Sequence, residues 1–324
     1  MRVAVTGSSG FVGGAVARDL AAHGHEVVAF SRRPPRLPDE LGDRVSHQAW
    51  DLRDGPLPKE DRPERVDAVV HCGAAVGDGG RHARAWVVNV EGTRAVRETF
   101  PEARFVHVSS GSVYDPRTPS VAATEDEAPA RGYLNAYGST KAAAERYLAA
   151  DAAREDRGPV VVLRPHAVYG PGDTTLLPRI EAAAVGAWLP LPGGGRVRQH
   201  LTHVDTLTLA VRAALVADVG PEVAAGRPLV ANVADAEPVE LGETVELLMF
   251  ARFRPVQVVD VPLPLARALA RAGELVARWT GHEPRLSRYA ISHLAMERTY
   301  DLTVLRERLG VDPAPTSLHG AMGW

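Results

Sequence analysis

Tyr137 and Lys141 form a pair whose residue types and spacing suggest chemistry. They lie four residues apart in a stretch with a helical pattern, so both side chains lie on one face of the helix. A tyrosine ionises near pH ~10, and a neighbouring ammonium lowers that pKa because it favours the phenolate. Tyr137 could then pass a proton to or from a hydroxyl or carbonyl oxygen. Ser110, which follows an apolar run, is placed to orient that oxygen.

Tyr-x-x-x-Lys is common on helix surfaces, so the catalytic interpretation depends on a second feature, the stretch Val3–Gly13. Its apolar beginning predicts a buried strand, and a helical pattern follows a glycine-rich turn. Gly7, Gly10 and Gly13 are spaced one residue wider than the G-x-G-x-x-G fingerprint. Glycines let the backbone approach phosphates, and a helix N-terminus attracts them. The stretch therefore predicts a site for the pyrophosphate of a dinucleotide.

Short apolar runs alternate with helical stretches through the first half of the chain, which predicts an α/β fold with a doubly wound parallel (Rossmann) sheet. The expected strands are Val3–Val5, Glu26–Phe30, Arg44–Ala49, Asp67–Cys72, Arg104–Val108 and Val160–Leu163, and the expected helices begin at Phe11 and span Ala85–Phe100 and Ala136–Ala153. Ligands of such folds bind outside the carboxyl ends of the strands, which is where Ser110 falls.

The alternation becomes irregular after Arg164, which predicts a smaller substrate domain interleaved with the sheet domain. Residues 1–165, with 200–235 returning to them, are expected to form the dinucleotide-binding domain, and 166–199 with 236–324 the substrate-binding domain. The expected elements are a loop at Leu191–Gly195, a strand at Leu229–Val233, and helices at Thr206–Ala217, Arg267–Trp279 and Leu302–Leu309.

Composition argues against several classes of protein. The net charge of −3 gives no reason to expect nucleic acid or an anionic membrane as a partner. Cys72 is the single cysteine, so no intrachain disulfide can form, and a reducing compartment fits. The sequence begins with a buried strand rather than a signal segment and has no apolar run of membrane-spanning length, so we expect a cytoplasmic protein. The histidines lack ligand spacing, so no metal site is expected.

Eight motifs, in order, give the chain a resemblance to the extended short-chain dehydrogenases/reductases, the NAD(P)-dependent epimerase/dehydratase superfamily. They are TGSSGFVG (6–13), Asp51-Leu52, VVHCGAA (69–75), NVEGT (89–93), VSSGSVY (108–114), YGSTK (137–141), LRPHAVYGPGD (163–173) and LTHVD (201–205). The matches cover nearly the whole length. The resemblance implies Ser-Tyr-Lys catalysis with a nicotinamide dinucleotide.

The resemblance also assigns roles to individual residues. Ser110, four residues before Tyr114, matches the catalytic serine, Tyr137 matches the general acid/base, and Lys141 matches its partner, which also holds the nicotinamide ribose. Asn89 matches the asparagine that supports the active-site helix and its water. The residues that match cofactor-binding positions are Gly7, Ser9, Gly10, Phe11, Val12, Gly13, Ser31, Arg32, Asp51, Leu52, Ala74, Tyr137, Lys141 and Pro165, with Asp51 and Leu52 at the adenine.

The end of the second expected strand bears on the form of the cofactor. Family members that use NAD usually carry an acid there, which binds the ribose 2′-hydroxyl. Ser31 occupies that position here, followed by Arg32 and Arg33. No carboxylate is left to repel a 2′-phosphate, and two guanidiniums are near enough to bind it, unless both are simply solvated loop charges. We therefore expect NADP(H), with NAD(H) less favoured.

Four positions depart from the sugar-nucleotide branches of the family. Gly111 and Ser112 stand where dehydratases have Asp-Glu, so sugar dehydration by that route is not expected. Ala167 replaces an asparagine that touches the nucleotide in those enzymes. Gln199 stands where they tend to have arginine, with Arg198 one residue off.

The segment 163–180 and the tail 282–313 instead resemble the 3β-hydroxysteroid and sterol dehydrogenase branch. His166 fits this branch, and we assign it a structural rather than a catalytic role. Apolar residues of the second half could line a substrate pocket, but the core of the smaller domain is the favoured interpretation; they are Leu176, Leu177, Trp188, Leu189 and Leu191.

The leading hypothesis is an NADP(H)-dependent oxidoreductase that interconverts a secondary alcohol and a ketone in a bulky or apolar small molecule, steroid-like or a natural product. A nucleotide-sugar epimerase or ketoreductase is the alternative. A non-catalytic dinucleotide-binding protein is least favoured, because Ser110, Tyr137 and Lys141 are all present.

The helices expected at Ala85–Phe100 and Ala136–Ala153 carry apolar residues on more than one face. In relatives, the equivalent helices pack against their own copies across a two-fold axis. We therefore expect a homodimer.

Overall fold

Parallel strands form the main sheet of the computed structural model, which describes residues 1–77, 82–280 and 286–324. The strands are β1 (Arg2–Thr6), β2 (Glu26–Ser31), β3 (Val45–Ala49), β4 (Ala68–His71), β5 (Arg104–Val108), β7 (Val160–Pro165) and β12 (Leu229–Val233). Their order across the sheet is β12-β7-β5-β4-β1-β2-β3, so the chain winds outward in both directions from β1 and β4. The predicted doubly wound parallel sheet is therefore confirmed, and the carboxyl ends of its strands share one edge.

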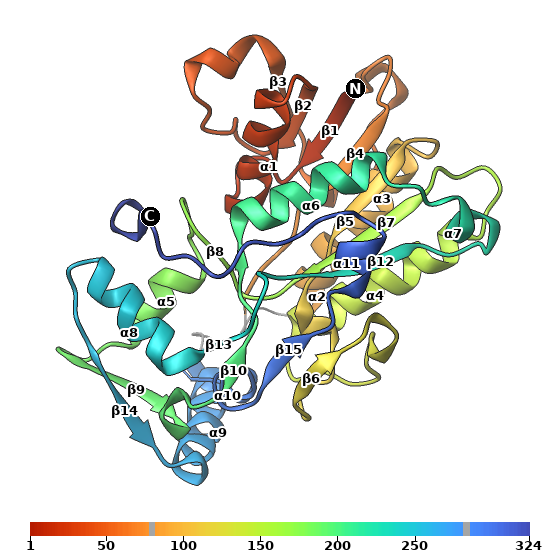
Figure 1. Ribbon diagram of the computed structural model, residues 1–324. Helices are drawn as coiled ribbons and strands as arrows, with labels where there is room; N and C mark the ends of the chain where they lie inside the picture. The colour runs from red at the N-terminus through yellow and green to blue at the C-terminus, as the bar shows by residue number, and fades with distance from the viewer. Residues whose placement is uncertain (78–81, 281–285) are drawn as a thin grey trace.

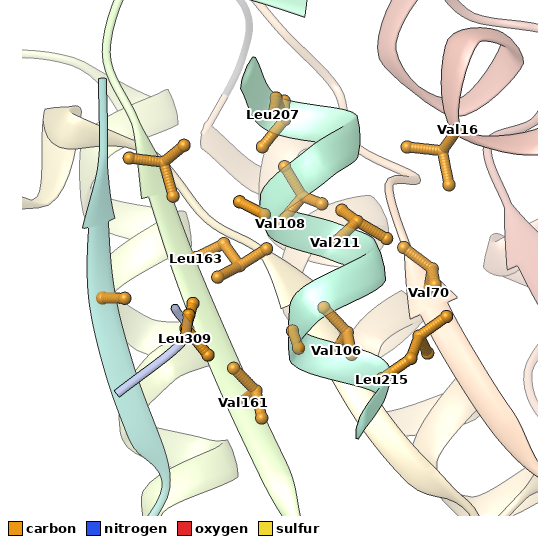
Figure 2. Close-up of a cluster of buried hydrophobic side chains, with 14 of the residues drawn as sticks. Val16, Val70, Val106, Val108, Val161, Leu163, Leu207, Val211, Leu215 and Leu309 are labelled. Atoms are coloured by element: carbon orange, nitrogen blue, oxygen red, sulfur yellow. The ribbon is translucent and has the colours of Figure 1, made fainter. Parts of the chain in front are cut away.

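Helices cover both faces of this sheet (Figure 1). They are α1 (Phe11–Ala22), α2 (His82–Trp86), α3 (Gly92–Thr99), α4 (Ala136–Ala152), α6 (Val204–Val216), α7 (Gly220–Ala224) and α11 (Thr303–Glu307). Figure 2 shows Leu207 and Val211 of α6 beside three valines and Leu163 of β5 and β7. A second buried cluster, on the other face, packs Val96 of α3 and Leu148 of α4 against Phe105. Each strand except the edge strand β3 contributes to both clusters, because its side chains alternate between the faces.

Smaller sheets and further helices make up most of the second half. They are β6 (Ser120–Ala123), β8 (Val168–Tyr169), β9 (Trp188–Pro192), β10 (Arg198–Gln199), β11 (Thr202–His203), β13 (Val239–Glu240), β14 (Gln257–Val261), β15 (Arg298–Tyr300), α5 (Leu176–Ala183), α8 (Leu241–Ala251), α9 (Leu263–Thr280) and α10 (Arg288–Ala295). The sheets have the orders β13-β10-β15-β6, β11-β8 and β14-β9. None of the helices in the described ranges combines the length and the apolar character that a membrane span needs.

Two expectations about local structure need correction. The helix expected at Ala85–Phe100 is present, but it begins at His82 and contains a π-helical turn at Val87–Glu91 between α2 and α3. The loop expected at Leu191–Gly195 begins inside β9, which pairs with β14 in parallel. Its prolines hid the strand pattern, since proline is tolerated mainly in edge strands.

A buried ion pair fixes the end of α4 that is distant from Tyr137. The Arg97 guanidinium donates to the Asp151 carboxylate at 2.6 Å, and also to the carbonyl oxygens of Ala103 (3.2 Å) and Gly158 (2.6 Å). Both side chains of the pair are almost fully buried, and Arg157 lies 3.1 Å from the other carboxylate oxygen. This network joins α3 and α4 to the segments that precede β5 and β7.

We predict that Asp151→Asn lowers the free energy of unfolding by about 3–5 kcal/mol, because it leaves the buried Arg97 charge without its counter-ion. Urea denaturation followed by circular dichroism measures this. The matched control is Asp156→Asn, which removes a pair that Arg154 makes at the surface and is expected to cost at most ~1 kcal/mol. Equal effects of the two substitutions would contradict the structural role of Asp151.

Candidate active site

Lys141 lies buried beneath the carboxyl end of β5. Its ammonium donates a hydrogen bond to the Val108 carbonyl oxygen at 2.7 Å, and only 3% of the residue is exposed. Burial lowers the pKa of Lys141 to about 8, while the nearby Cys72 and Glu145 act in the opposite direction. Lys141 therefore holds a charge that titrates close to neutrality rather than a fixed surface charge.

Tyr137 occupies the first turn of α4, where the Asn135 side chain caps the helix by accepting from the Gly138 amide at 3.0 Å. Burial raises the pKa of Tyr137, and a hydrogen bond with the Ser110 hydroxyl partly offsets this. The sequence predicted that Lys141 would lower this pKa, and that direction is wrong here because the ammonium is held by Val108 and burial dominates. A neutral phenol is the form that can donate a proton.

Ser110 begins the short helix Gly111–Val113 and links the site to the C-terminal part of the chain. Its Oγ accepts from the Ser112 amide at 3.1 Å and donates to Ser112 Oγ at 3.0 Å. The hydroxyl of Tyr289, on α10, lies 2.6 Å from Ser112 Oγ. Sequence reasoning missed Tyr289, because no spacing rule connects residues that lie so far apart in the chain.

Gly111 lies where the surrounding side chains leave no room for a Cβ atom. A Cβ there would lie 2.8 Å from the Tyr300 hydroxyl and 3.0 Å from His166 Nδ1. The aspartate that dehydratases carry at this position would therefore displace buried groups. This geometry agrees with the expectation that sugar dehydration is not the reaction.

Asn89 lies at the centre of the π-helical turn and bridges the sheet edge to α4. Its Oδ1 accepts from the Ala75 amide at 2.7 Å, and its Nδ2 donates to the Ala75 carbonyl (3.2 Å) and to Thr140 Oγ1 (2.9 Å). π-Helical turns of this kind occur frequently at functional sites. Thr140 precedes Lys141, so this bridge fixes the part of α4 that carries the site.

The glycine-rich turn forms a cradle that fits a pyrophosphate. Gly7 has φ of +70°, and a Cβ on Gly13 would lie 2.3 Å from the Gly7 carbonyl oxygen. Gly10 is the N-cap of α1, where no side chain among the described residues caps the helix and no acidic residue occupies the first turn. Amide groups at Phe11 and Val12 are therefore placed to bind an anion, and Ser9 and Gly10 are exposed beside them.

Ser31 lies at the end of β2, as expected, but its hydroxyl points inward. It donates to the Arg33 carbonyl oxygen at 2.6 Å and lies 2.8 Å from Ser8 Oγ. The phosphate contact expected of Ser31 would need this bond to open, whereas Arg32 is exposed. Arg32 is also close enough to Asp51 to help lower the pKa of that carboxyl to about 2, although the Arg53 guanidinium, 2.6 Å away, is the main cause.

The remaining candidate cofactor residues follow the same edge of the sheet. Leu52 fills the space beside Gly73 and Gly92, where added Cβ atoms would lie 2.6 Å and 3.0 Å from its side chain. Ala74 precedes the residue that Asn89 binds, and Pro165 is the buried last residue of β7. The structure thus brings the cofactor-binding candidates to one edge, with Ser110, Tyr137 and Lys141 beside them.

His166 and Gln199 form a buried structural pair. The Gln199 amide donates to the carbonyl oxygens of His293 (2.7 Å) and Met296 (2.8 Å), so its Oε1 faces His166 Nε2 at 3.1 Å. His166 therefore carries its proton on Nε2 and accepts from the Tyr300 hydroxyl through Nδ1 at 3.2 Å. Burial lowers the pKa of His166 to about 3, so the ring is neutral. Its structural assignment agrees with these contacts.

The polar groups of Gln199 and Arg198 make hydrogen bonds within the chain. The Gln199 amide is used inside the protein, and exposed Arg198 donates weakly to the Pro238 carbonyl oxygen at 3.4 Å. Within the described ranges, no group of three or more His, Cys, Asp or Glu side chains is arranged to hold a metal ion.

Comparisons with known proteins agree with this geometry. The model of the NAD dependent epimerase/dehydratase family matches residues 3–226. A 2-alkyl-3-oxoalkanoate reductase of Stenotrophomonas maltophilia is 32% identical over 97% of this chain and 95% of its own length. A 3 beta-hydroxysteroid dehydrogenase/Delta 5-->4-isomerase of Mycobacterium tuberculosis is 27% identical over 98% of this chain and 87% of its own length. The solved structure of MoeE5 in complex with UDP-glucose and NAD is 25% identical, with a TM-score of 0.74 over 99% of this chain and 96% of that one.

We predict that Tyr137→Phe lowers kcat at least ~10²-fold, the usual scale for losing a general acid/base, while the affinity for the dinucleotide changes little. Steady-state kinetics and cofactor titration measure the two effects. Tyr147→Phe is the matched control, because it removes a half-buried hydroxyl from the same helix, and we expect near-normal turnover. Retained activity in the Tyr137 variant would refute the assignment.

The lowered pKa of Lys141 predicts a pH dependence of stability. Between pH ~8 and ~10.5 the unfolded chain holds a proton on this amine that the folded chain has lost, so the free energy of unfolding rises with pH in that window. Lys141→Met lacks this contribution. We therefore expect the melting temperature of cofactor-free wild type to rise relative to that of this variant between pH 8 and 10. Melting temperatures that change equally with pH in the two proteins would show that Lys141 is not buried as a titrating amine.

Proposed function

The chain belongs to the NAD dependent epimerase/dehydratase family, and from this membership we propose that it is an NADPH-dependent ketoreductase for a bulky, apolar substrate. The family assignment makes it an extended short-chain oxidoreductase with a nicotinamide dinucleotide cofactor. A 3-oxo acid with long alkyl chains is the substrate type that we favour, since a 2-alkyl-3-oxoalkanoate reductase is similar to this chain over nearly its full length.

The observation that carries the proposal is the buried Gln199. Sugar-nucleotide enzymes of this family tend to have arginine there, and a cation suits a diphosphate. Here the amide is neutral, 2% exposed and bonded to two carbonyl oxygens and His166. That position therefore offers no charge to a nucleotide diphosphate, which favours a substrate without one.

The site residues can supply the proton that ketone reduction requires. A dinucleotide held at the glycine-rich cradle would supply the hydride to the carbonyl carbon. Ser110 can donate a hydrogen bond to the carbonyl oxygen once its bond to Ser112 opens, and the neutral Tyr137 hydroxyl can transfer its proton to that oxygen. Once released from the Val108 carbonyl oxygen, the Lys141 ammonium would stabilise the tyrosinate left behind. The reverse order of these steps oxidises an alcohol.

We also propose a homodimer, although helices α2, α3 and α4 leave less apolar surface exposed than the sequence predicted. Ala142, Ala144 and Leu148 of α4 are buried within the chain itself. Exposed apolar groups near this helix include Ala149 of α4 itself, and Trp86 and Val87, each 38% exposed. Light scattering at micromolar concentration tests the assembly, and a monomeric mass would contradict it.

The reaction is tested by measuring NADPH oxidation with three substrates: a long-chain 2-alkyl-3-oxo acid, a 3-oxosteroid and UDP-glucose. We expect turnover of at least one apolar ketone and none with the sugar nucleotide. Interconversion of UDP-glucose with its epimer, without net consumption of cofactor, would show instead that the chain is an epimerase.

The proposed preference for NADP(H) is tested at Arg32. We predict that Arg32→Ala weakens NADPH by about 1.5–3 kcal/mol, the range for a hydrogen bond to a charged group, and leaves NADH unchanged. Ser31→Asp is expected to weaken NADPH and improve NADH, because a carboxylate repels the 2′-phosphate and accepts from a 2′-hydroxyl.

The matched control is Arg33→Ala, which removes the other exposed arginine of the bend that follows β2. The measurement is kcat/KM for both cofactors in all four proteins. If the ratio of the two cofactors does not change in Arg32→Ala, the assignment of NADP(H) through this residue is wrong.

A further inference from the structure

Helix α9 presents an apolar face to solvent at an edge of the molecule, where Figure 1 shows it beside α10. One side of the helix packs Ala266 and Ala270 against Ile291 of α10, and all three are buried. The opposite side consists of large apolar residues: Leu265 is 52% exposed, Leu269 54%, Leu275 56%, Val276 59% and Trp279 86%.

This face reverses the usual pattern of a surface helix, which has polar residues on its solvent side. At about 100° per residue, the exposed apolar residues cover an arc of roughly 120°, with Ala268 and Ala272 between them. These five exposed apolar residues form a stripe along the helix, which is about 21 Å long from Leu265 to Trp279 at ~1.5 Å per residue. Contiguous apolar surface of this kind marks a site that another molecule or a membrane covers.

The charges beside the stripe are positive. Arg267 and Arg271 lie on one flank, both are exposed, and neither has a carboxylate partner among the described residues. Glu274 is the single acid of α9, and its carboxylate is held by Arg288 at 2.8 Å, on the side that faces α10. An occupant of the stripe therefore meets apolar groups with cations along one border.

We propose that α9 is an interfacial helix that docks this protein onto an anionic phospholipid bilayer, with its axis in the plane of the membrane. Leu265, Leu269 and Trp279 would enter the boundary between headgroups and acyl chains, and Arg267 and Arg271 would lie among the phosphates. A second copy of the chain fits less well, because the pairing would bring unneutralised arginines onto the shared border.

This proposal departs from the expectation of no membrane partner. That expectation used the net charge of −3 of the whole chain, whereas binding depends on the local arrangement of charge. The docking surface is also connected to the candidate active site, because α10 packs against α9 and carries Tyr289, which contacts Ser112. Membrane binding itself requires neither cofactor nor substrate, so it is tested separately from the proposed reaction.

The experiment is co-sedimentation of the full chain with phosphatidylcholine vesicles, with and without phosphatidylglycerol. We expect binding to the anionic vesicles that weakens in high salt, and a blue shift of tryptophan fluorescence that Trp279→Phe abolishes. A Leu265→Glu/Leu269→Glu double variant is expected to partition at least ~10-fold more weakly, because it loses two buried leucines at the interface. Both residues are exposed, so its melting temperature is expected to match that of wild type.

Phe250→Glu is the matched control, because Phe250 of α8 is 70% exposed and lies outside the stripe. Its vesicle binding is expected to equal that of wild type. The proposal is overturned if wild type does not bind anionic vesicles, or if the Phe250 variant loses binding as much as the double variant does. It is also overturned if the double variant instead turns a dimer into a monomer while vesicle binding is unchanged, since a second copy would then occupy the stripe.

Discussion

The burial of the Lys141 ammonium at the carboxyl end of β5 is the constraint on which the rest of the site depends. A charge in this position must be hydrogen-bonded, and the Val108 carbonyl oxygen, 2.7 Å away, accepts from it. This contact sets where α4 crosses the edge of the sheet, and so where Tyr137 meets Ser110. The helix is held at both ends, by the Asn89–Thr140 bridge near the site and by the Arg97–Asp151 pair at the far end. The position of the catalytic pair is thus a property of the whole sheet domain.

The same burial sets the protonation states at the site. It raises the pKa of Tyr137 and lowers the pKa of Lys141 to about 8, so the two values, which are close together in free side chains, move apart. A protonated tyrosine beside an amine that is still largely charged at neutrality suits donation of a proton to a carbonyl oxygen. The neutral His166–Gln199 pair adds no charge at the place where a sugar-nucleotide enzyme tends to have one. Together these features favour the reduction of an apolar ketone.

Sequence reasoning predicted the parts of this arrangement that have strong local signals. Most strands of the main sheet contain short apolar runs. The glycine-rich turn and the Tyr137–Lys141 pair each lie within one short segment of the sequence. The π-helical turn at Val87–Glu91 was missed because it differs from an α-helix by a single extra residue. The two-residue strands and the Tyr289–Ser112 contact were missed because they arise only when distant segments pack together. The direction of the Tyr137 pKa was wrong because spacing on a helix says nothing about burial.

The central claim is that this site reduces a ketone with a hydride from its dinucleotide, and isotope transfer tests it most directly. The protein would be supplied with NADPH that carries deuterium at the transferable position of the nicotinamide and with a long-chain 2-alkyl-3-oxo acid. The account predicts an alcohol with one deuterium on the carbinol carbon, formed in equal amount to the NADP⁺ produced. Two results would contradict it. One is an alcohol without deuterium; the other is unchanged ketone, together with epimerisation of a sugar nucleotide when that is supplied in its place.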